Sequence, residues 1–441
     1  MYWVYNVLIT LLAPIWVPWM WMRANRRQEK IDWKERTGVY TFDVKPDRPH
    51  IWFHAVSVGE VVASMPILRE LRSRCPEAEI VLSVTTSSGH QTALDKAEGL
   101  YDHLVYFPID VPRFAMQAML RARPDVVAIM ETELWFNFLW AAKSFDANTL
   151  LINGRISDRS FPRSQKIRFF YKALLSHVDR CLMQTETDAE RIVELGAGTA
   201  EVFGNCKFDQ AAQTQGVDAD ALRQEFAIPP DAFVVVIGST RGEDEEALIL
   251  EALERLHEAT YVIHAPRHLE RVPSILSQRS TKGLATAQRS RSETGPYLLL
   301  DTYGELDKVF HLADVVVIGG GFGNYGGQNL IQPLACGKPV LHGEHMQNFR
   351  DVTEAALKAG ASLECTTADQ LAQEIQRLRH DQATRERMAA AATKLVEQNL
   401  GASIRYADAI IEASQSPFQA RRDRQAKQAE RRRQIQADRA T

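Results

Sequence analysis

The stretch His54-Ala55-Val56-Ser57-Val58-Gly59-Glu60 decides the fold of this chain. It follows an apolar run at 51–53, which is typical of a strand, and it precedes a helical pattern over 61–72. We therefore expect a strand to end here, a turn containing Gly59 to follow, and Glu60 to lie in the first turn of a helix. Ligands bind at this corner in an open α/β sheet, so the carboxylate stands where a substrate hydroxyl could reach it.

Strand-like apolar runs alternate with helical patterns from His50 to about Cys206, and they do so again in the second half of the chain. Such alternation indicates right-handed crossovers and parallel sheets. Two series in one chain predict an α/β fold of two doubly wound, Rossmann-like domains. The expected strands are 51–56, 80–85, 104–107, 126–130, 150–153, 233–238, 261–265, 297–300, 315–318 and 339–341.

The composition is that of a globular chain. It has 441 residues, of which 45% are hydrophobic and 24% charged, so we expect two or three domains. The net charge of −4 gives no reason to expect nucleic acid as a partner. The five cysteines are scattered and never form a CxxC pair, which argues against a disulfide framework or a zinc site and fits a reducing compartment.

The N-terminus is apolar. Tyr2–Met22 holds 21 residues without a charge and includes four tryptophans, which is long enough to span a membrane. Three arginines follow by position 27, the reverse of a secretory signal, and this order places the body in the cytoplasm. Two prolines within the stretch leave two alternatives open: a helix lying in the membrane interface, or a buried helix docked on a domain.

The basic tail is the other charged feature. Residues 421–441 carry a net charge of +5, which leaves −9 for the rest of the chain. We expect this tail to be mobile, or helical only on contact, and either attracted to anionic lipid or simply solvated. The expected parts are a membrane anchor (1–27), an N-terminal domain (28–209), a linker (210–221), a C-terminal domain (222–400), a closing helix (401–416) and the tail (417–441).

Carboxylates follow two of the expected strands. Glu60 can serve as a general base, or it can simply satisfy the N–H groups of its helix; we expect the helix N-terminus to lower its pKa and keep it ionised. Glu131 and Glu133 directly follow the strand at 126–130, where consecutive acids can also be ordinary caps. No grouping of side chains suggests a metal, and we expect neither a metal nor a cofactor.

Cations and glycines are candidates for holding phosphate. The glycine-rich segment 319–329 follows a strand and leads into a short helix, so its backbone could approach a phosphate, or it could be a flexible loop. It matches neither a dinucleotide fingerprint nor a Walker loop. The fork of Arg267 suits a phosphate or carboxylate, and Lys207 is a second candidate, although either can form a surface ion pair.

Taken together, the motifs resemble those of the bacterial 3-deoxy-D-manno-octulosonic acid (Kdo) transferase family, in the family's order. The resemblance implies a metal-independent, inverting glycosyltransferase of the two-Rossmann-domain (GT-B) type. It would move Kdo from CMP-Kdo to a lipid A precursor at the cytoplasmic face of the inner membrane. The motifs are HAVSVGE (54–60), METELW (130–135), NGRIS (153–157), KFD (207–209), GST (238–240), PRH (266–268), GEL (304–306) and PVL (339–341).

The resemblance assigns roles to individual residues. Glu60 would be the general base, and Glu131 and Lys207 would stabilise the transition state, with Glu133 as the alternative to Glu131. The cytidylate pocket would be formed by Pro266, Arg267, Gly304, Glu305, Leu306, Asn329, Leu330, Ile331 and Gln332.

The last of these positions departs from the family. The family usually has Glu where this chain has Gln332, and an amide lacks the charge-assisted strength of a carboxylate. Two alternatives therefore stay open. One is another GT-B sugar-nucleotide enzyme acting on a membrane glycolipid, such as a UDP-sugar transferase or epimerase. The other is a non-catalytic scaffold that binds glycolipid.

Overall fold

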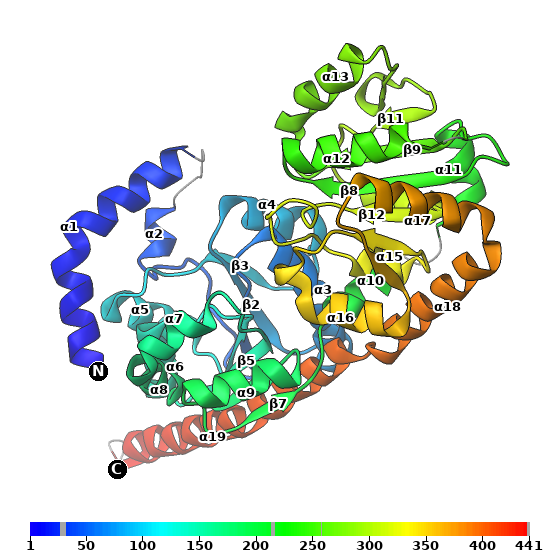
Figure 1. Ribbon diagram of the computed structural model, residues 1–441. Helices are drawn as coiled ribbons and strands as arrows, with labels where there is room; N and C mark the ends of the chain where they lie inside the picture. The colour runs from blue at the N-terminus through cyan, green and yellow to red at the C-terminus, as the bar shows by residue number, and fades with distance from the viewer. Residues whose placement is uncertain (27–31, 213–216, 257, 439–441) are drawn as a thin grey trace. The chain divides into compact units, whose positions relative to one another are not determined.

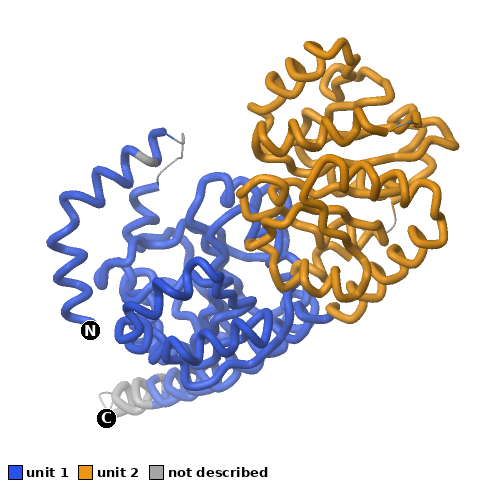
Figure 2. Tube along the Cα trace, in the orientation of Figure 1, with its two compact units in different colours: residues 1–206, 401–441 blue, residues 207–400 orange. Residues whose placement is uncertain are grey.

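The protein consists of two compact units (Figure 2). Unit 1 comprises Met1–Cys206 and Gly401–Thr441, and unit 2 comprises Lys207–Leu400. The structure is a computed structural model that describes residues 1–26, 32–212, 217–256 and 258–438.

Unit 1 is built on a seven-stranded sheet in which every pairing is parallel (Figure 1). The strands lie in the order β3-β2-β1-β4-β5-β6-β7. They are β1 (His50–His54), β2 (Glu79–Val84), β3 (His103–Tyr106), β4 (Val126–Met130), β5 (Asn148–Gly154), β6 (Arg180–Met183) and β7 (Ala200–Val202). The helices are α1 (Tyr2–Arg26), α2 (Trp33–Arg36), α3 (Val58–Arg74), α4 (Ser87–Lys96), α5 (Pro112–Ala122), α6 (Phe136–Ser144), α7 (Phe161–Lys166), α8 (Arg168–Leu175), α9 (Glu186–Leu195) and α19 (Ala402–Asp438).

The direction of winding in unit 1 reverses between β1 and β4. Strands β2 and β3 lie on one side of β1, and β4 to β7 lie on the other. Helix α3, which follows β1, packs with Ile51 and Phe53 on one face, whereas α6, which follows β4, packs with Trp52 on the opposite face. The two chain segments therefore diverge at the carboxyl ends of adjacent strands, which is where open α/β sheets bind ligands.

Hydrogen bonds hold the start of helix α1 to unit 1. The Tyr5 hydroxyl donates to Asp110 Oδ2 at 2.7 Å, and the Asn6 amide donates to Asn137 Oδ1 at 2.9 Å. The helix is long and apolar enough to cross a membrane by length and composition, it carries no charge before Arg23, and it exposes large side chains, including 69% of Leu11 and 68% of Ile15. The alternative of a buried N-terminal helix therefore does not describe it.

The C-terminal helix closes unit 1. Helix α19 continues through Pro417 as far as Asp438, so the chain beyond Pro417, which we expected to be mobile or helical only on contact, extends this helix. Near its start, the Tyr406 hydroxyl donates to Gly204 O at 2.8 Å, next to the point where the chain leaves the unit. Residues 439–441, together with the side chains of 431–438, lie outside what the structure describes, and so does Arg27 of the expected anchor.

Arg421 fastens the extended helix to the sheet. Its guanidinium makes a bidentate ion pair with Asp125, with Nε to Oδ1 at 3.0 Å and Nη2 to Oδ2 at 2.7 Å. It also donates to the carbonyls of Pro46 and Arg48, at 2.6 Å each. Asp125 is buried and additionally accepts the backbone N–H of His50 at 2.8 Å. The pair therefore joins α19 to the start of β1 and β4.

Unit 2 repeats the architecture with a second parallel seven-stranded sheet (Figure 1), in the order β10-β11-β9-β8-β12-β13-β14. Here the winding reverses between β8 and β12. The strands are β8 (Val234–Thr240), β9 (Tyr261–Pro266), β10 (Ala287–Gln288), β11 (Tyr297–Leu299), β12 (Val315–Ile318), β13 (Val340–His342) and β14 (Ser362–Glu364). The α-helices are α10 (Lys207–Ala212), α11 (Ala219–Glu225), α12 (Glu243–Glu254), α13 (Val272–Thr281), α14 (Leu306–Val309), α15 (Ile331–Ala335), α16 (Arg350–Ala359), α17 (Ala368–His380) and α18 (Gln382–Gln398).

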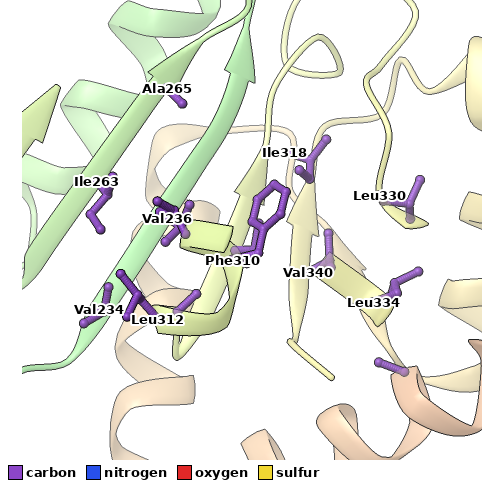
Figure 3. Close-up of a cluster of buried hydrophobic side chains, with 14 of the residues drawn as sticks. Val234, Val236, Ile263, Ala265, Phe310, Leu312, Ile318, Leu330, Leu334 and Val340 are labelled. Carbon is purple, nitrogen blue, oxygen red and sulfur yellow. The ribbon is translucent and has the colours of Figure 1, made fainter. Parts of the chain in front are cut away.

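One core of unit 2 holds α15 in place. Figure 3 shows Leu330 and Leu334 beside Ile318 and Val340, and Phe310 between β8 and β12. Leu330 and Leu334 are fully buried, so the start of α15 has a fixed position on the sheet. Because burying a leucine contributes about 2 kcal/mol, this short helix depends on packing rather than on helix propensity.

All ten expected strands are present, with ends that shift by up to two residues. Four short strands were not expected: β6, β7, β10 and β14. Lys207, which we placed in the N-terminal domain, begins α10 in unit 2, where that helix packs on α15. The expected linker at 210–221 contains the end of α10 and the start of α11, and its residues 213–216 lie outside the described part.

The Arg421–Asp125 pair yields a stability prediction. Replacing Arg421 by Met leaves the buried Asp125 without its cation, so we expect the free energy of unfolding to fall by about 3 kcal/mol. Urea denaturation followed by circular dichroism measures the change. Arg422→Met, at an exposed position on the same helix, is the control and should leave the midpoint nearly unchanged. Equal midpoints for the two variants would show that α19 is not fastened at this point.

Candidate functional site

Glu60 lies at the third position of α3, directly after the turn that follows β1. Its Oε2 accepts the backbone N–H of Val56 at 2.9 Å, and its Oε1 accepts the Ser57 hydroxyl at 3.2 Å. Ser57 is the N-cap residue of α3, but its side chain makes no capping bond. The carboxylate therefore closes the turn by itself, and the capping role we left open for Glu60 is present.

The pKa of Glu60 is raised rather than lowered. Burial raises it most, the charges of Glu131 and Glu133 raise it further, and together they bring the pKa to about 7. The hydrogen bonds from Val56 and Ser57 lower the pKa, but they do not cancel the rise. The expectation that the helix N-terminus would lower this pKa was therefore wrong, because burial and two like charges outweigh the helix.

Glu131 and Glu133 follow β4 on the same edge of the sheet. Glu131 has a left-handed backbone, with φ of 56°, and its N–H donates to Ile152 O at 3.0 Å. That conformation costs about 1 kcal/mol or more for a non-glycine residue, so the surrounding structure must impose it. Burial, and then the charge of Glu131, raise the pKa of Glu133. Three carboxylates expected from the sequence thus come within electrostatic reach of one another.

His54, at the end of β1, belongs to the core rather than to this group. Its Nδ1 pairs with Ser83 Oγ at 2.9 Å, and its ring stacks on Phe107 with centroids 4.0 Å apart. Burial lowers its pKa to about 3, so the imidazole is neutral at physiological pH. Glu60 is therefore the stronger candidate for a base at this corner.

In unit 2, the two loops at the reversal of winding are tied to a buried glutamate. Glu245, the third residue of α12, accepts the N–H of Gly320 at 2.6 Å and also that of Arg241. Burial raises its pKa to about 6, although both backbone bonds oppose the rise. A Cβ on Gly319 would lie 2.6 Å from Thr240 Cα, so only glycine permits this approach of the two loops.

Arg267 stands directly after β9. Its backbone N–H donates to Thr240 O at 2.8 Å, and its side chain is exposed, whereas the preceding Pro266 is buried. The guanidinium is therefore available on the carboxyl side of the sheet of unit 2, next to the loop after β8. This position suits an anion held by the unit.

Glu305 is already paired within the fold. Its Oε1 accepts from Arg289 Nε at 3.0 Å and Nη2 at 2.9 Å, and its Oε2 accepts the Thr302 hydroxyl. Burial would raise its pKa, but these bonds and the charge of Arg289 lower it. The residues on either side differ: Gly304 is exposed with a left-handed φ of 87°, and Leu306 begins α14.

Two polar side chains, Asn329 and Gln332, lie at the start of α15. Asn329 Oδ1 accepts the N–H of Ile331 at 3.0 Å, and the side chains of Leu330 and Ile331 are buried, so these two could reach a ligand only through their backbone. Gln332 is half-buried, and its Nε2 donates to Asp307 Oδ1 at 2.5 Å.

The structure thus gathers the expected residues into two groups. Glu60, Glu131 and Glu133 lie in unit 1, whereas Lys207 and all nine expected nucleotide-binding residues lie in unit 2. In the described part of the chain, no three His, Cys, Asp or Glu side chains come together in a way that could hold a metal ion.

Two polar residues of unit 2 were not among our candidates. Glu245 lies among four acids at the start of α12, a pattern that is typical of ordinary helix capping. Its position could have identified it, because Glu245, like Glu60, is the third residue of the helix that follows a strand and a turn. Asp307 directly follows the GEL motif (304–306) in the sequence, and its contact with Gln332 is what distinguishes it in the structure.

Comparison with known proteins gives a consistent result. The family described as 3-deoxy-D-manno-octulosonic-acid transferase (kdotransferase) matches residues 31–210, and that described as glycosyl transferases group 1 matches residues 297–395. The chain is 32% identical to the 3-deoxy-D-manno-octulosonic acid transferase of Bordetella pertussis over 92% of this chain and 98% of that protein.

Two further similarities bear on architecture. A bifunctional glycosyltransferase/methyltransferase of Fusobacterium nucleatum is 31% identical over 86% of this chain, which spans 59% of that longer protein. Among solved structures, a glycosyltransferase from Rickettsia africae superimposes with a TM-score of 0.60 at 11% identity, covering 83% of this chain and 99% of that one. At that identity the likeness shows the fold alone, which is of the GT-B type.

The raised pKa of Glu60 makes a pH-dependent prediction. Because the folded protein holds this proton more tightly than a carboxyl of ordinary pKa 4.5, the contribution of Glu60 to stability is fully present below about pH 4.5 and is lost as the pH rises through about 7. Glu60→Gln removes that loss. We expect the variant to match the wild type near pH 4 and to exceed it by up to about 3 kcal/mol at pH 8.

Urea midpoints at a series of pH values measure this difference. Glu190→Gln, on the exposed surface of α9, is the matched control and should follow the wild type throughout. A difference between Glu60→Gln and the wild type that stays constant with pH would mean that Glu60 titrates normally.

Proposed function

The chain belongs to the family of 3-deoxy-D-manno-octulosonic acid transferases, and we propose that it moves Kdo from CMP-Kdo to a lipid A precursor with inversion, using Glu60 as the general base. As a glycosyltransferase of this family it acts in lipopolysaccharide biosynthesis. The observation that carries the proposal is the half-buried carboxylate at the carboxyl end of β1, whose pKa is about 7.

The proposed step is a single displacement. Glu60 accepts the proton of an acceptor hydroxyl as that oxygen bonds to the anomeric carbon of Kdo. The bond from that carbon to the phosphate oxygen breaks, and CMP leaves with the electron pair. Attack opposite the leaving group inverts the anomeric configuration. A base with a pKa near the working pH combines a useful ionised fraction with enough basicity to accept the proton.

Charge on the departing CMP would be met within unit 2. Arg267 offers a fork that fits a phosphate, Lys207 adds a second cation at the start of α10, and the glycine-rich loop adds backbone N–H groups. These groups supply the positive charge that a metal ion would otherwise provide, which supports a metal-independent reaction. Glu131, or Glu133 in its place, would tune Glu60 through its charge and stabilise the transition state.

The acceptor is a lipid, so the enzyme must work beside a membrane. The exposed apolar side chains of α1 support attachment, and the arginines that follow the apolar stretch support an orientation with the body at the cytoplasmic face of the inner membrane. Membrane lipid would then be a partner, and the basic end of α19 would add attraction to anionic headgroups.

Loss of the base tests the proposed role of Glu60. In Glu60→Gln we expect kcat for Kdo transfer from CMP-Kdo to a lipid A precursor to fall at least about a hundredfold, because the amide cannot accept the proton. CMP affinity should not change, since the proposed nucleotide contacts lie in unit 2. Product mass after incubation with purified protein measures transfer, with Glu190→Gln as the control.

Three outcomes of this experiment would count against the proposal. Unchanged transfer by Glu60→Gln removes the base assignment. Protection of the wild type by UDP rather than CMP favours another sugar-nucleotide enzyme. Absence of transfer by the wild type to any glycolipid favours a binding scaffold.

Membrane attachment through α1 is tested by charge insertion. Leu11→Glu combined with Ile15→Glu places two charges on exposed positions of the apolar helix, so we expect most of the protein to move from the membrane fraction to the supernatant. Tyr5→Phe removes the hydrogen bond to Asp110 but no apolar surface, and it should stay with the membrane. Retention of the double variant in the membrane fraction would assign attachment to another surface.

A further inference from the structure

Two neighbouring cavities lie at the edge of the unit 1 sheet where β1 and β4 begin. One, of about 190 Å³, is bounded by the segment 43–50, the end of α5 and α19, and the other, of about 290 Å³, by the end of α5, the turn after α6 and α19. A water molecule takes about 30 Å³ of liquid volume, so each cavity has room for a group of about five heavy atoms. The five residues of β1 separate this edge from the turn that holds Glu60, so the cavities are not part of the proposed reaction site.

The charges that line these cavities are paired, with one exception. Four arginines and three aspartates contribute to the lining. Three of the arginines each pair with one aspartate: Arg121 with Asp43, Arg421 with Asp125 and Arg424 with Asp146. The fourth, Arg123, lines both cavities, and within the described part of the chain no carboxylate pairs with it. The lining therefore carries one uncompensated positive charge.

The backbone of Arg123 is fixed in a conformation that favours glycine. It follows α5 with a left-handed φ of 42°, its N–H donates to Met119 O at 2.8 Å, and its carbonyl oxygen accepts from His50 Nδ1 at 2.9 Å. Glycine usually occupies this position after a helix, because a side chain is strained there. The chain thus holds a guanidinium where glycine would fit with less strain, which indicates a use for the side chain.

The guanidinium of Arg123 has unfilled donors that face solvent. Its Nε donates to Leu120 O at 3.3 Å, and among the described residues its two terminal nitrogens have no acceptor. In the neighbouring Arg121, Nη1 lies 2.6 Å from Asp43 Oδ1, whereas Nε is buried and, within the same described residues, has no hydrogen-bond partner. The Asp43 side chain is 86% exposed, so water weakens this ion pair. Both arginines can therefore donate to a further anion.

We infer that these cavities form a binding site for a phosphate group, with Arg123 as its main contact and Arg121 as the second. A guanidinium fork binds phosphate oxygens through two parallel hydrogen bonds. Leu120, which is 58% exposed, and Phe145 add apolar surface to the larger cavity, so a phosphate ester with an apolar part fits there. A lipid headgroup and free phosphate offer the same oxygens. The inference does not depend on the proposed function, because the site lies at the other end of the strands.

The melting temperature of the full-length protein in a maltoside detergent, at constant ionic strength, tests the site. The probes are inorganic phosphate and, in separate samples, phosphatidylglycerol added to the micelle, with diacylglycerol as the lipid that lacks phosphate. Excess CMP in every sample keeps phosphate out of the proposed nucleotide pocket. A ligand that binds only the folded protein raises the melting temperature. We expect Arg123→Gly to need at least about tenfold more of the probe than the wild type for the same rise.

Three comparisons separate ligand binding from a structural role of Arg123. Without a probe, Arg123→Gly should melt no lower than the wild type, because glycine adopts the left-handed backbone without strain. Arg113→Gln removes the same charge from an exposed position at the start of α5, and it should respond to the probe like the wild type. Asp43→Asn removes a negative charge from the smaller cavity, so it should respond at about threefold lower probe concentration.

The two probes also distinguish the source of the phosphate. A rise with phosphatidylglycerol alone assigns the site to a lipid headgroup, and a rise with inorganic phosphate assigns it to free phosphate; either supports the inference if Arg123→Gly loses it. The inference is wrong if the wild type responds to neither probe, or if Arg123→Gly responds as the wild type does. An equal loss of response in Arg113→Gln would show a general effect of charge and would also contradict it.

Discussion

In each unit, a glutamate at the third position of the first crossover helix bonds back to a backbone N–H that precedes the helix. Glu60 binds Val56 N in unit 1, and Glu245 binds Arg241 N in unit 2. Both turns lie where the winding of a parallel sheet reverses. Closing such a turn with a carboxylate requires a partly buried charge at the edge of the sheet, which is also where ligands bind. The architecture thus places an acid, in both units, at the edge of the sheet where open α/β folds bind ligands.

The two glutamates differ in their surroundings. The second oxygen of Glu245 accepts the N–H of Gly320, and this bond connects the glycine-rich loop to the loop after β8. This carboxylate therefore has a positioning role. The second oxygen of Glu60 accepts the Ser57 hydroxyl, and the charges of two further acids, Glu131 and Glu133, act on it. Like charges that face one another raise proton affinity. The same local motif can therefore serve as a clamp in unit 2 and, in our account, as a base in unit 1.

The alternation of apolar strands and helical patterns predicted the two sheets, because strands buried on both faces appear as unbroken apolar runs. Short edge strands such as β7 and β10 lack that signal. Glu60, Glu131 and Arg267 could be placed from the sequence since each follows a strand end. The direction of the Glu60 pKa shift could not, because it depends on burial and on acids about 70 residues away in the chain. The position of Lys207 depends on how α10 packs, and the contact between Asp307 and Gln332 joins positions 25 residues apart in the chain. The helix beyond Pro417 could not be predicted from local composition, because Arg421 of that segment pairs with Asp125, which is distant in the sequence.

The central claim is that Glu60 is a base whose pKa is raised partly by Glu131. The pH dependence of kcat/KM for Kdo transfer, measured for the wild type and for Glu131→Gln, tests it most directly. The account predicts that the wild-type rate rises with pH through an acidic limb near pH 7, and that the limb moves to lower pH in Glu131→Gln, whatever the loss in maximal rate. An acidic limb that stays at the same pH in both proteins, or a wild-type rate with no limb near neutrality, would contradict it.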